Sequence, residues 1–589
     1  MDRKRRDLIA QWSFDTRPIL GRFHLWLDDV EETWLVGEPH ADISFVGEGL
    51  ERAFIMAAAV TSLGTRLFGR FGEAADGDKA LINRVKKDAD AVSAYALSEA
   101  LWYLTRHLPE MHGVMVSLGE GLMPKVGETP EMGSNPLLGF GRVYARPQVA
   151  RFLDRRVQRL LNDADYGWER FWTELQVAGV TVWGAAIDTL ENTSRFAKGK
   201  ETGPMTLFNL FDQPLSVCQP YEGYVGNLVL PRPVVEHAID RGVLISYLTP
   251  RAKVLEIISE VYPDIAPERV HIWTLGGKSR AKRIGSLWQE WRDLGAHIVE
   301  DGWKFPGSKY GVFTDSGTYA PTFKIGTFTD EEGLNNLFIC DGYAASAEAI
   351  QAASLDPVMD LHTSLCLFSS KFVVPYEREQ LIMRLDAEGD GFGGALGHIL
   401  GREMSVEEVD EYKEIIRLAR DAGMPLGKKV TTVDDFFPLK KWETLAIAGY
   451  MLPDPYTGAP GVEVVGDHRY RVTVRAMTKG HQVEVALTLR LMEPIDHSRL
   501  VFSPLLDRFY SGEDYKNRAV KVSDSGRIRN ELQTLASEAL QYVDEDRIRV
   551  DLNSVDDAVL PPDKKALIGD VLRWYKENHP TWFSWVELA

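Results

Sequence analysis

Cysteine is nearly absent from this sequence, which has three in 589 residues: Cys218, Cys340 and Cys366. Cysteines so few and so far apart exclude a disulfide framework and a thiolate-based structural zinc site, and they indicate a reducing compartment. Hydrophobic runs are short as well. The longest, at 53–60, has less than half of the ~20 apolar residues that a membrane span needs. The sequence therefore predicts a cytoplasmic protein with no membrane partner.

Basic residues are outnumbered by acidic ones, 67 against 86, which gives a net charge of −19. A surface this negative repels nucleic acid and anionic lipid, so neither is expected as a partner. The early basic run at 3–6 is not followed by a long apolar stretch. It is therefore interpreted as a solvated N-terminal cap and not as a signal peptide.

Several common catalytic motifs are missing. The sequence contains no H-E-x-x-H, no C-x-x-C and no G-x-S-x-G. Its 13 histidines are scattered, and none pairs with another at metal-ligand spacing. These absences disfavour the usual zinc, thiol and serine hydrolase chemistries.

The middle of the sequence alternates strand and helix patterns. Apolar runs at Val243–Leu248, Val270–Leu275 and Ala296–Glu300 each predict a short strand, and helical patterns separate them. Leu337–Asp341 predicts a further strand with a helix after it. Strands joined in this way are typical of a parallel sheet. The predicted fold class is therefore α/β, with a parallel, Rossmann-like core and flanking helices.

Composition and pattern divide the chain into three expected domains. Residues 1–200 are expected to be mainly helical, with a Gly/Pro-rich loop at 119–141. Residues 201–455 hold the parallel sheet, and residues 456–589 form an α+β region.

The C-terminal region is expected to combine a hairpin with helices. Apolar residues alternate with period two in Tyr470–Ala476 and Gln482–Arg490, on either side of a Lys-Gly turn. This pattern predicts an antiparallel hairpin. Helical patterns follow at 528–543 and 564–578.

A glycine-containing, basic turn joins the second predicted strand to its helix. It consists of Gly276, Gly277, Lys278, Ser279 and Arg280. A helix N-terminus offers free N–H groups, and ligands of open α/β sheets bind beyond the carboxyl ends of strands. Cations at that position oppose the helix dipole, so local stability does not explain them. The turn therefore predicts an anion site, with a solvated basic helix start as the alternative; its glycine spacing does not match a Walker A loop.

Carboxylates stand at the ends of two predicted strands. Asp341 ends one strand, and Glu300 and Asp301 end another. On a shared sheet they would line the same edge as the basic turn, which suits Mg²⁺ bridging acid side chains and phosphate oxygens. Asp341 is therefore predicted as a metal ligand or catalytic acid/base, and Glu300 as a metal ligand; a helix N-cap and a polar turn are the alternatives. His362 is a candidate general base, with a structural histidine as the alternative.

Two functional hypotheses follow. The first is a cytoplasmic enzyme that acts on a small anionic substrate, phosphorylated or a nucleotide, with Mg²⁺ and a nucleotide as candidate cofactors. Phosphoryl or nucleotidyl transfer and sugar-phosphate chemistry would use these parts. The second is a non-enzymatic scaffold or assembly subunit, since the sequence has 15 Trp and 20 Tyr and both residue types are enriched at interfaces. The sequence leaves a homo-oligomer open.

Overall fold

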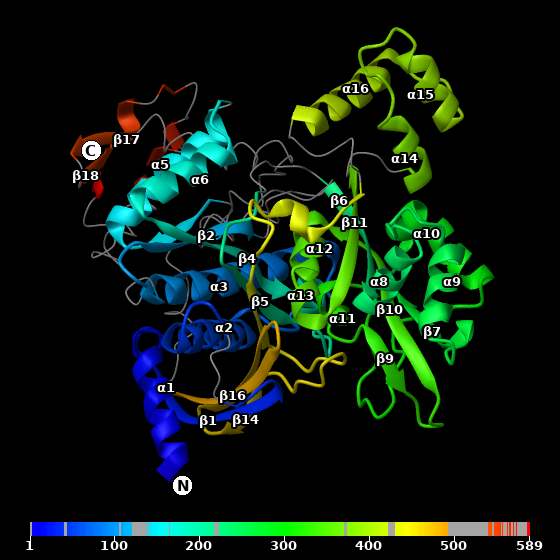
Figure 1. Ribbon diagram of the computed structural model, residues 1–589. Helices are drawn as coiled ribbons and strands as arrows, with labels where there is room; N and C mark the ends of the chain where they lie inside the picture. The colour runs from blue at the N-terminus through cyan, green and yellow to red at the C-terminus, as the bar shows by residue number, and fades with distance from the viewer. Residues whose placement is uncertain are drawn as a thin grey trace. The chain divides into compact units, whose positions relative to one another are not determined.

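A computed structural model describes most of the chain (Figure 1). The described residues are 3–39, 44–104, 108–119, 138, 141–163, 165–216, 223–369, 374–421, 430–492, 540–544, 547–554 and scattered positions from 556 to 588. They form two compact units: residues 1–218, 437–453 and 459–589 belong to the first, and residues 219–436 and 454–458 to the second. Within the described residues, no helix is both long and apolar enough to cross a membrane.

The first unit is built on a nine-stranded sheet. Its strands are β1 (Leu25–Val36), β2 (His112–Gly119), β3 (Val143–Ala145), β4 (Thr181–Glu191), β5 (Met205–Phe211), β13 (Thr444–Tyr450), β14 (Glu463–Gly466), β15 (Arg469–Thr478) and β16 (His481–Leu491). They run in the order β1-β16-β15-β13-β5-β4-β2-β3, with β14 beside β15. Only β2 and β4 pair in parallel, and the other pairs are antiparallel.

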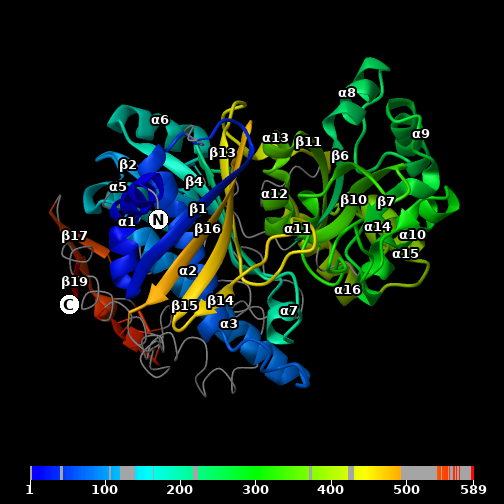
Figure 2. The same cartoon turned by 90° about the horizontal axis from the view of Figure 1, so that it is seen from below.

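One helix occupies the centre of this unit. The helices are α1 (Arg3–Arg22), α2 (Glu48–Phe68), α3 (Lys79–Leu104), α5 (Pro147–Asn162), α6 (Trp168–Ala178) and α7 (Thr193–Ala197). The sheet curves around α2, as Figures 1 and 2 show. Because α2 is apolar on nearly every face, it is buried along most of its length.

The second unit holds a seven-stranded sheet. Its strands are β6 (Gly223–Pro231), β7 (Val270–Trp273), β8 (His297–Ile298), β9 (Gly326–Thr329), β10 (Asn335–Ala345), β11 (Leu361–Ser369) and β12 (Val430–Thr431). They run in the order β12-β11-β6-β10-β7-β8, with β9 beside β10. Only the pairs β10–β7 and β7–β8 are parallel.

Helices cover both faces of this second sheet. They are α8 (Arg232–Asp240), α9 (Arg251–Val261), α10 (Lys278–Asp293), α11 (Tyr319–Thr322), α12 (Ser346–Ala353), α13 (Asp356–Met359), α14 (Tyr376–Ile382), α15 (Phe392–Leu400) and α16 (Val406–Asp421). Helices α8, α9 and α10 bury their apolar sides in one core with β6, β7 and β10. Helix α12 packs against β6, β10 and β11.

The fold is mixed α/β, and the predicted Rossmann-like parallel core needs correction. Among the described strands of the second unit, parallel pairing is limited to β8, β7 and β10, within a sheet that is otherwise antiparallel. The run Val243–Leu248 is not a strand. Leu244 is 81% exposed there, while Ile245 and Tyr247 are buried beneath the sheet. Strand β6 lies beside β10 instead. The sequence pattern did not predict β6 as a strand.

Two local predictions are confirmed. The expected hairpin is β15 paired antiparallel with β16, and its turn contains Gly480 at φ +83°. The predicted strand Leu337–Asp341 lies within β10, parallel to β7.

Other predictions concern segments that lie mostly outside the described residues. Cys218, nearly all of the stretch 119–141 and most of 528–578 lie outside the described residues. Residues 540–544 form strand β17, where the sequence predicted the end of a helix; β17 pairs with β18 (Arg547–Val550), and β18 with β19 (Val586–Leu588).

A short segment returns to the second unit after the chain has re-entered the first. Residues 454–458 make this return, and Tyr456 is their buried anchor. The Tyr456 hydroxyl donates to the carbonyl of Phe313 at 2.6 Å and accepts from Nε1 of Trp273 at 2.9 Å. The second unit therefore includes residues that the chain supplies only after Pro453.

Gly226, in the middle of the second sheet, leaves space for the ring of Tyr247. A Cβ atom on Gly226 would come within 2.3 Å of the ring of Tyr247, which is fully buried. We therefore expect Gly226→Ala to lower the free energy of unfolding by about 1–3 kcal/mol, through overpacking. Urea denaturation would measure the change.

The matched control is Gly285→Ala in α10, where the added methyl meets nothing within 4 Å. This change should preserve stability or raise it by up to about 1 kcal/mol, because alanine favours a helix. A Gly226→Ala protein as stable as the control would show that the Tyr247 ring moves aside without cost.

Candidate functional site

The carboxyl ends of β7 and β8 bring several predicted residues to one sheet edge, beside the middle of β10. Cys340 of β10 pairs with Trp273 of β7, and Ile272 of β7 pairs with Ile298 of β8. Because β7 and β8 are parallel, the chain leaves both at the same edge, whereas β10 continues past Asp341 to Ala345. The turn 274–277 and the segment 299–301 therefore lie at this edge. The prediction that Asp341 ends its strand is wrong, because Asp341 lies within β10, paired with Leu228 of β6.

The turn between β7 and α10 depends on its two glycines. The Gly276 N–H donates to the carbonyl of Thr314 at 2.6 Å, and a Cβ at Gly276 would lie 3.2 Å from the Thr314 hydroxyl oxygen. Gly277 has φ +113°, a conformation that side chains disfavour, and it precedes α10 with no side-chain cap. The first N–H groups of α10 therefore have no helical acceptor.

The basic residues of this region divide into two groups. Lys278 and Lys282 are exposed, and neither forms an ion pair within the described part of the chain. Arg283 instead points inward: it is 5% exposed and donates to Glu379 at 2.7 Å and to the Tyr343 hydroxyl at 2.8 Å. The predicted cluster is thus two exposed lysines, the half-buried Arg280 and one structural arginine, Arg283.

The side chain of Asp341 is buried and forms hydrogen bonds in the interior of the second unit. Its carboxylate is 2% exposed and binds Arg251 through two hydrogen bonds, Nε–Oδ2 at 2.7 Å and Nη2–Oδ1 at 2.9 Å. Trp291 Nε1 donates to the same carboxylate at 2.7 Å. A buried carboxylate engaged on both oxygens presents no exposed side to Mg²⁺ or to a substrate. This geometry favours a positioning role for Asp341, since it joins β10 to α9 and α10.

Glu300 and His362 lie apart from Asp341. Glu300 is exposed in the segment after β8. His362 pairs with Leu230 of β6, whereas Asp341 pairs with Leu228 on the opposite side of β6. With a full strand between them, their backbones are about 10 Å or more apart, so His362 and Asp341 do not form an acid/base pair.

His362 is half-buried near charged neighbours. Burial lowers its pKa, as does Arg232, while Asp434 opposes the shift. Among the residues that the structure describes, no three or more His, Cys, Asp or Glu side chains gather into a group that would hold a metal ion.

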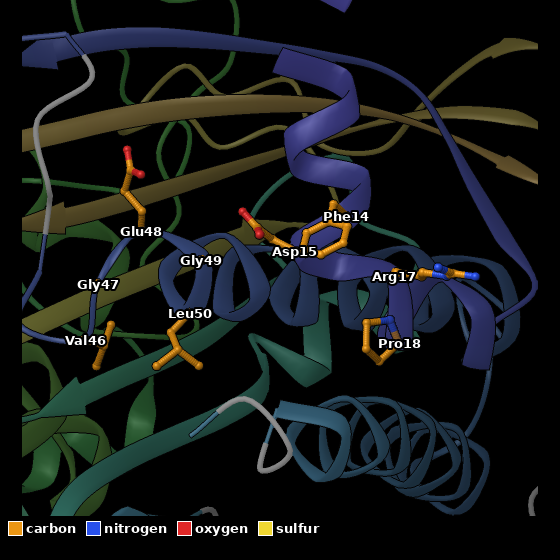
Figure 3. A pocket seen from close by; sticks show the side chains of 9 residues that line it. All are labelled: Phe14, Asp15, Arg17, Pro18, Val46, Gly47, Glu48, Gly49 and Leu50. Atoms are coloured by element: carbon orange, nitrogen blue, oxygen red, sulfur yellow. The ribbon is translucent and has the colours of Figure 1, made fainter. Parts of the chain in front are cut away.

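A separate hollow lies in the first unit and was not foreseen (Figure 3). Its volume is about 500 Å³, within the range of small-molecule pockets. The lining residues are Phe14, Asp15, Arg17, Pro18, Val46, Gly47, Glu48, Gly49 and Leu50. Asp15 and Glu48 both pair with Arg52, which balances much of their charge. The walls come from α1 and the start of α2, so no contiguous sequence signal marks the hollow.

The comparisons with known proteins identify no family for this chain. No protein-family model matches the chain, and no curated protein sequence matches it.

The ion pair of Asp341 gives a test of its role. We expect Asp341→Ala to lower the free energy of unfolding by about 3–5 kcal/mol, because it leaves Arg251 charged and buried without its partner. The double variant Asp341→Leu with Arg251→Met should recover much of that loss, since no buried charge remains. Urea denaturation of the three proteins would measure both effects.

An exposed pair of the same unit supplies the control. Glu388 binds Arg417 at 2.8 Å with both side chains exposed, so Glu388→Ala should cost less than about 1 kcal/mol. If Asp341→Ala changed stability no more than Glu388→Ala does, the positioning role of Asp341 would be wrong.

Proposed function

We propose that the chain is an enzyme that binds a small anionic, phosphorylated ligand at the turn between β7 and α10. The observation that carries the proposal is the uncapped start of α10, with Lys278 exposed and without an ion pair beyond the carboxyl ends of the parallel strands β7 and β8. Backbone N–H groups and a lysine at one helix start are the donors that a phosphate group takes.

Local stability gives no reason for a cation at this position. A positive charge in the first turn opposes the helix dipole by a few tenths of a kcal/mol. Lys278 has no carboxylate partner in the described part of the chain, although the protein carries a net charge of −19. A bound anion would supply the missing negative charge.

The surroundings of the turn suit a phosphorylated ligand that carries its own metal. Asp341 is committed to Arg251, but Glu300 is exposed at the same edge. A nucleotide-bound Mg²⁺ is held by phosphate oxygens and one or two carboxylates, and it keeps several waters. In this proposal Gly276, Gly277, Lys278, Ser279 and Arg280 hold the phosphate, and Glu300 faces the metal.

The class of reaction rests on the chemistry of those groups. Phosphoryl or nucleotidyl transfer depends on positioning and charge neutralisation more than on a protein nucleophile. A fixed turn with backbone donors and one lysine contributes to both.

A thermal-shift series tests the binding step. The probes are inorganic phosphate, ATP and a sugar phosphate, each with and without Mg²⁺. We expect at least one probe to stabilise the wild type, and Lys278→Ala to weaken its binding roughly ten- to hundredfold, the effect of losing a charged hydrogen bond of about 1.5–3 kcal/mol.

Lys282→Ala is the matched control. It removes an equal, exposed charge about 6 Å further along the same helix, so it should weaken binding less than Lys278→Ala does. The same stabilisation of wild type and Lys278→Ala by a probe would remove Lys278 from the site. No stabilisation by any probe would contradict the proposal and favour the scaffold hypothesis.

A further inference from the structure

Two histidines of neighbouring parallel strands bind each other directly. His271 of β7 and His297 of β8 are register partners, and their Nδ1 atoms are 2.8 Å apart. The rings meet edge to face, with their planes at 84°. A contact between two Nδ1 atoms at this distance requires one proton between them, so one ring donates and the other accepts.

A chain of hydrogen bonds decides which ring donates. The Asn336 amide nitrogen donates to Asp330 at 3.1 Å and to the Leu334 carbonyl at 2.9 Å, so the amide oxygen of Asn336 is the atom that faces His271. That oxygen lies 2.9 Å from Nε2 of His271. Nε2 of His271 therefore carries a hydrogen, and a neutral His271 accepts at Nδ1.

The last group in this series of hydrogen bonds is Asp330, which stays a charged carboxylate. Hydrogen bonds from the Leu334 N–H, from Asn336 and from Arg269 hold the pKa of Asp330 well below its usual range. Asp330 thus remains an acceptor throughout the physiological pH range, and it keeps the Asn336 amide in this orientation.

The two rings differ in how they take up protons. His297 donates from Nδ1 and keeps the lone pair of Nε2, so a first proton binds there without breaking any of these hydrogen bonds. A second proton can bind only at Nδ1 of His271. Its addition would turn two N–H groups toward each other across 2.8 Å, and two positive charges would share the contact.

The surroundings disfavour that second charge. Burial lowers the pKa of His271, and His297 and Arg269 lower it further, against opposing effects of Asn336 and Asp330. Burial also lowers the pKa of His297, and Glu300 opposes this shift.

Aromatic rings fill the remaining space around His271. Trp303 lies with its ring centroid 4.9 Å from that of His271, and Phe328 lies at 5.7 Å. Rings in these positions leave little room for water to solvate a charge.

The strand that carries His297 is short, and Ala296 and Ile298, the neighbours of His297, pack against the core of the second unit. β8 has two residues, His297–Ile298, and the ladder to β7 continues only through the Val299 N–H, which donates to Ile272 at 2.9 Å. We propose that the His271–His297 pair is a pH switch, which holds β8 on β7 while it carries at most one added proton and releases β8 on taking up a second.

The direction of the pH effect follows from proton counting. Both pKa values in the folded state lie below the ordinary value of 6.5, so the released state binds more protons than the closed state below that pH. The closed state is therefore most stable above 6.5, and its stability falls as the pH decreases. If the proposed function is right, release also moves Glu300 away from the turn 274–277; the switch itself does not depend on that function.

Hydrogen exchange of the full-length protein tests the switch. Peptides covering 295–303 would be followed from about pH 7.5 to 5.0, which stays above the ordinary pKa values of Asp and Glu, about 3.9 and 4.3. After correction for intrinsic exchange, we expect protection of the β8 amides to be constant near neutral pH. Below about pH 6 it should fall roughly tenfold per pH unit, the slope of one additional proton on opening.

A matched pair of variants identifies the group. His297→Asn keeps an amide at the position of Nδ1 but cannot be protonated, and its amide can turn to accept from a charged His271. Burial still lowers the pKa of His271, so the loss of protection with falling pH should be smaller than in the wild type. His237→Asn removes another histidine of the same unit, one that contacts Glu260, and should keep the slope of the wild type. A constant wild-type profile, a His297→Asn profile as steep as that of the wild type or a constant His237→Asn profile would each overturn the proposal.

A direct measurement covers the case in which His297→Asn fails to fold. Nitrogen-15 NMR of the histidines in the wild type should show the Nδ1–H tautomer for His297 and the Nε2–H tautomer for His271 at neutral pH. Observation of the Nε2–H tautomer in both rings would refute the proton arrangement on which the switch depends.

Discussion

The second unit is organised around the buried pair of Arg251 and Asp341. Taking two charges out of water is expensive, and the cost is offset only if every donor and acceptor finds a partner. Here the carboxylate receives Trp291 in addition to Arg251, and Arg251 also donates to the carbonyls of Tyr247 and Thr249. The pair therefore fixes three elements, α9, α10 and β10, at one point beneath the sheet.

That fixed point determines what the candidate site can be. Helix α10 is held twice: Trp291 binds Asp341, and Arg283 binds Glu379 near the other end of the helix. A helix anchored at both ends presents its first turn in one orientation, which is the preorganisation that ligand sites need. The same anchoring removes Asp341 and Arg283 from the exposed edge and leaves Lys278 there, so the basic turn and the acidic residue have different roles.

Local patterns in the sequence predicted local structure well. The hairpin of β15 and β16 was evident because its strands are adjacent and alternate with period two. The antiparallel place of β6 was not, because β6 pairs with β10 and β11, more than a hundred residues further along the chain. A short apolar run indicates that a strand is buried, but it does not indicate which strand pairs with it.

The candidate site shows the same division. The basic turn was found because its residues are contiguous, whereas the partner of Asp341 is Arg251, 90 residues away, with no pattern that links them. The histidine pair was within reach: His271 and His297 are the second residues of two predicted strands, and parallel register aligns such positions. The scattered spacing of the histidines concealed this, because strand pairing, and not sequence distance, brings them together.

The pairing of β1 with β16 has a consequence for synthesis. Leu25 is bonded opposite Leu491, and the whole second unit lies between them in the chain. At typical elongation rates of about 5–20 residues per second, the N-terminal strand waits for roughly half a minute or longer before its partner emerges from the ribosome. For most of that interval the apolar helix α2 lacks β13 and β15 of the sheet that later encloses it, so the nascent first unit needs protection from aggregation until the second unit has been made.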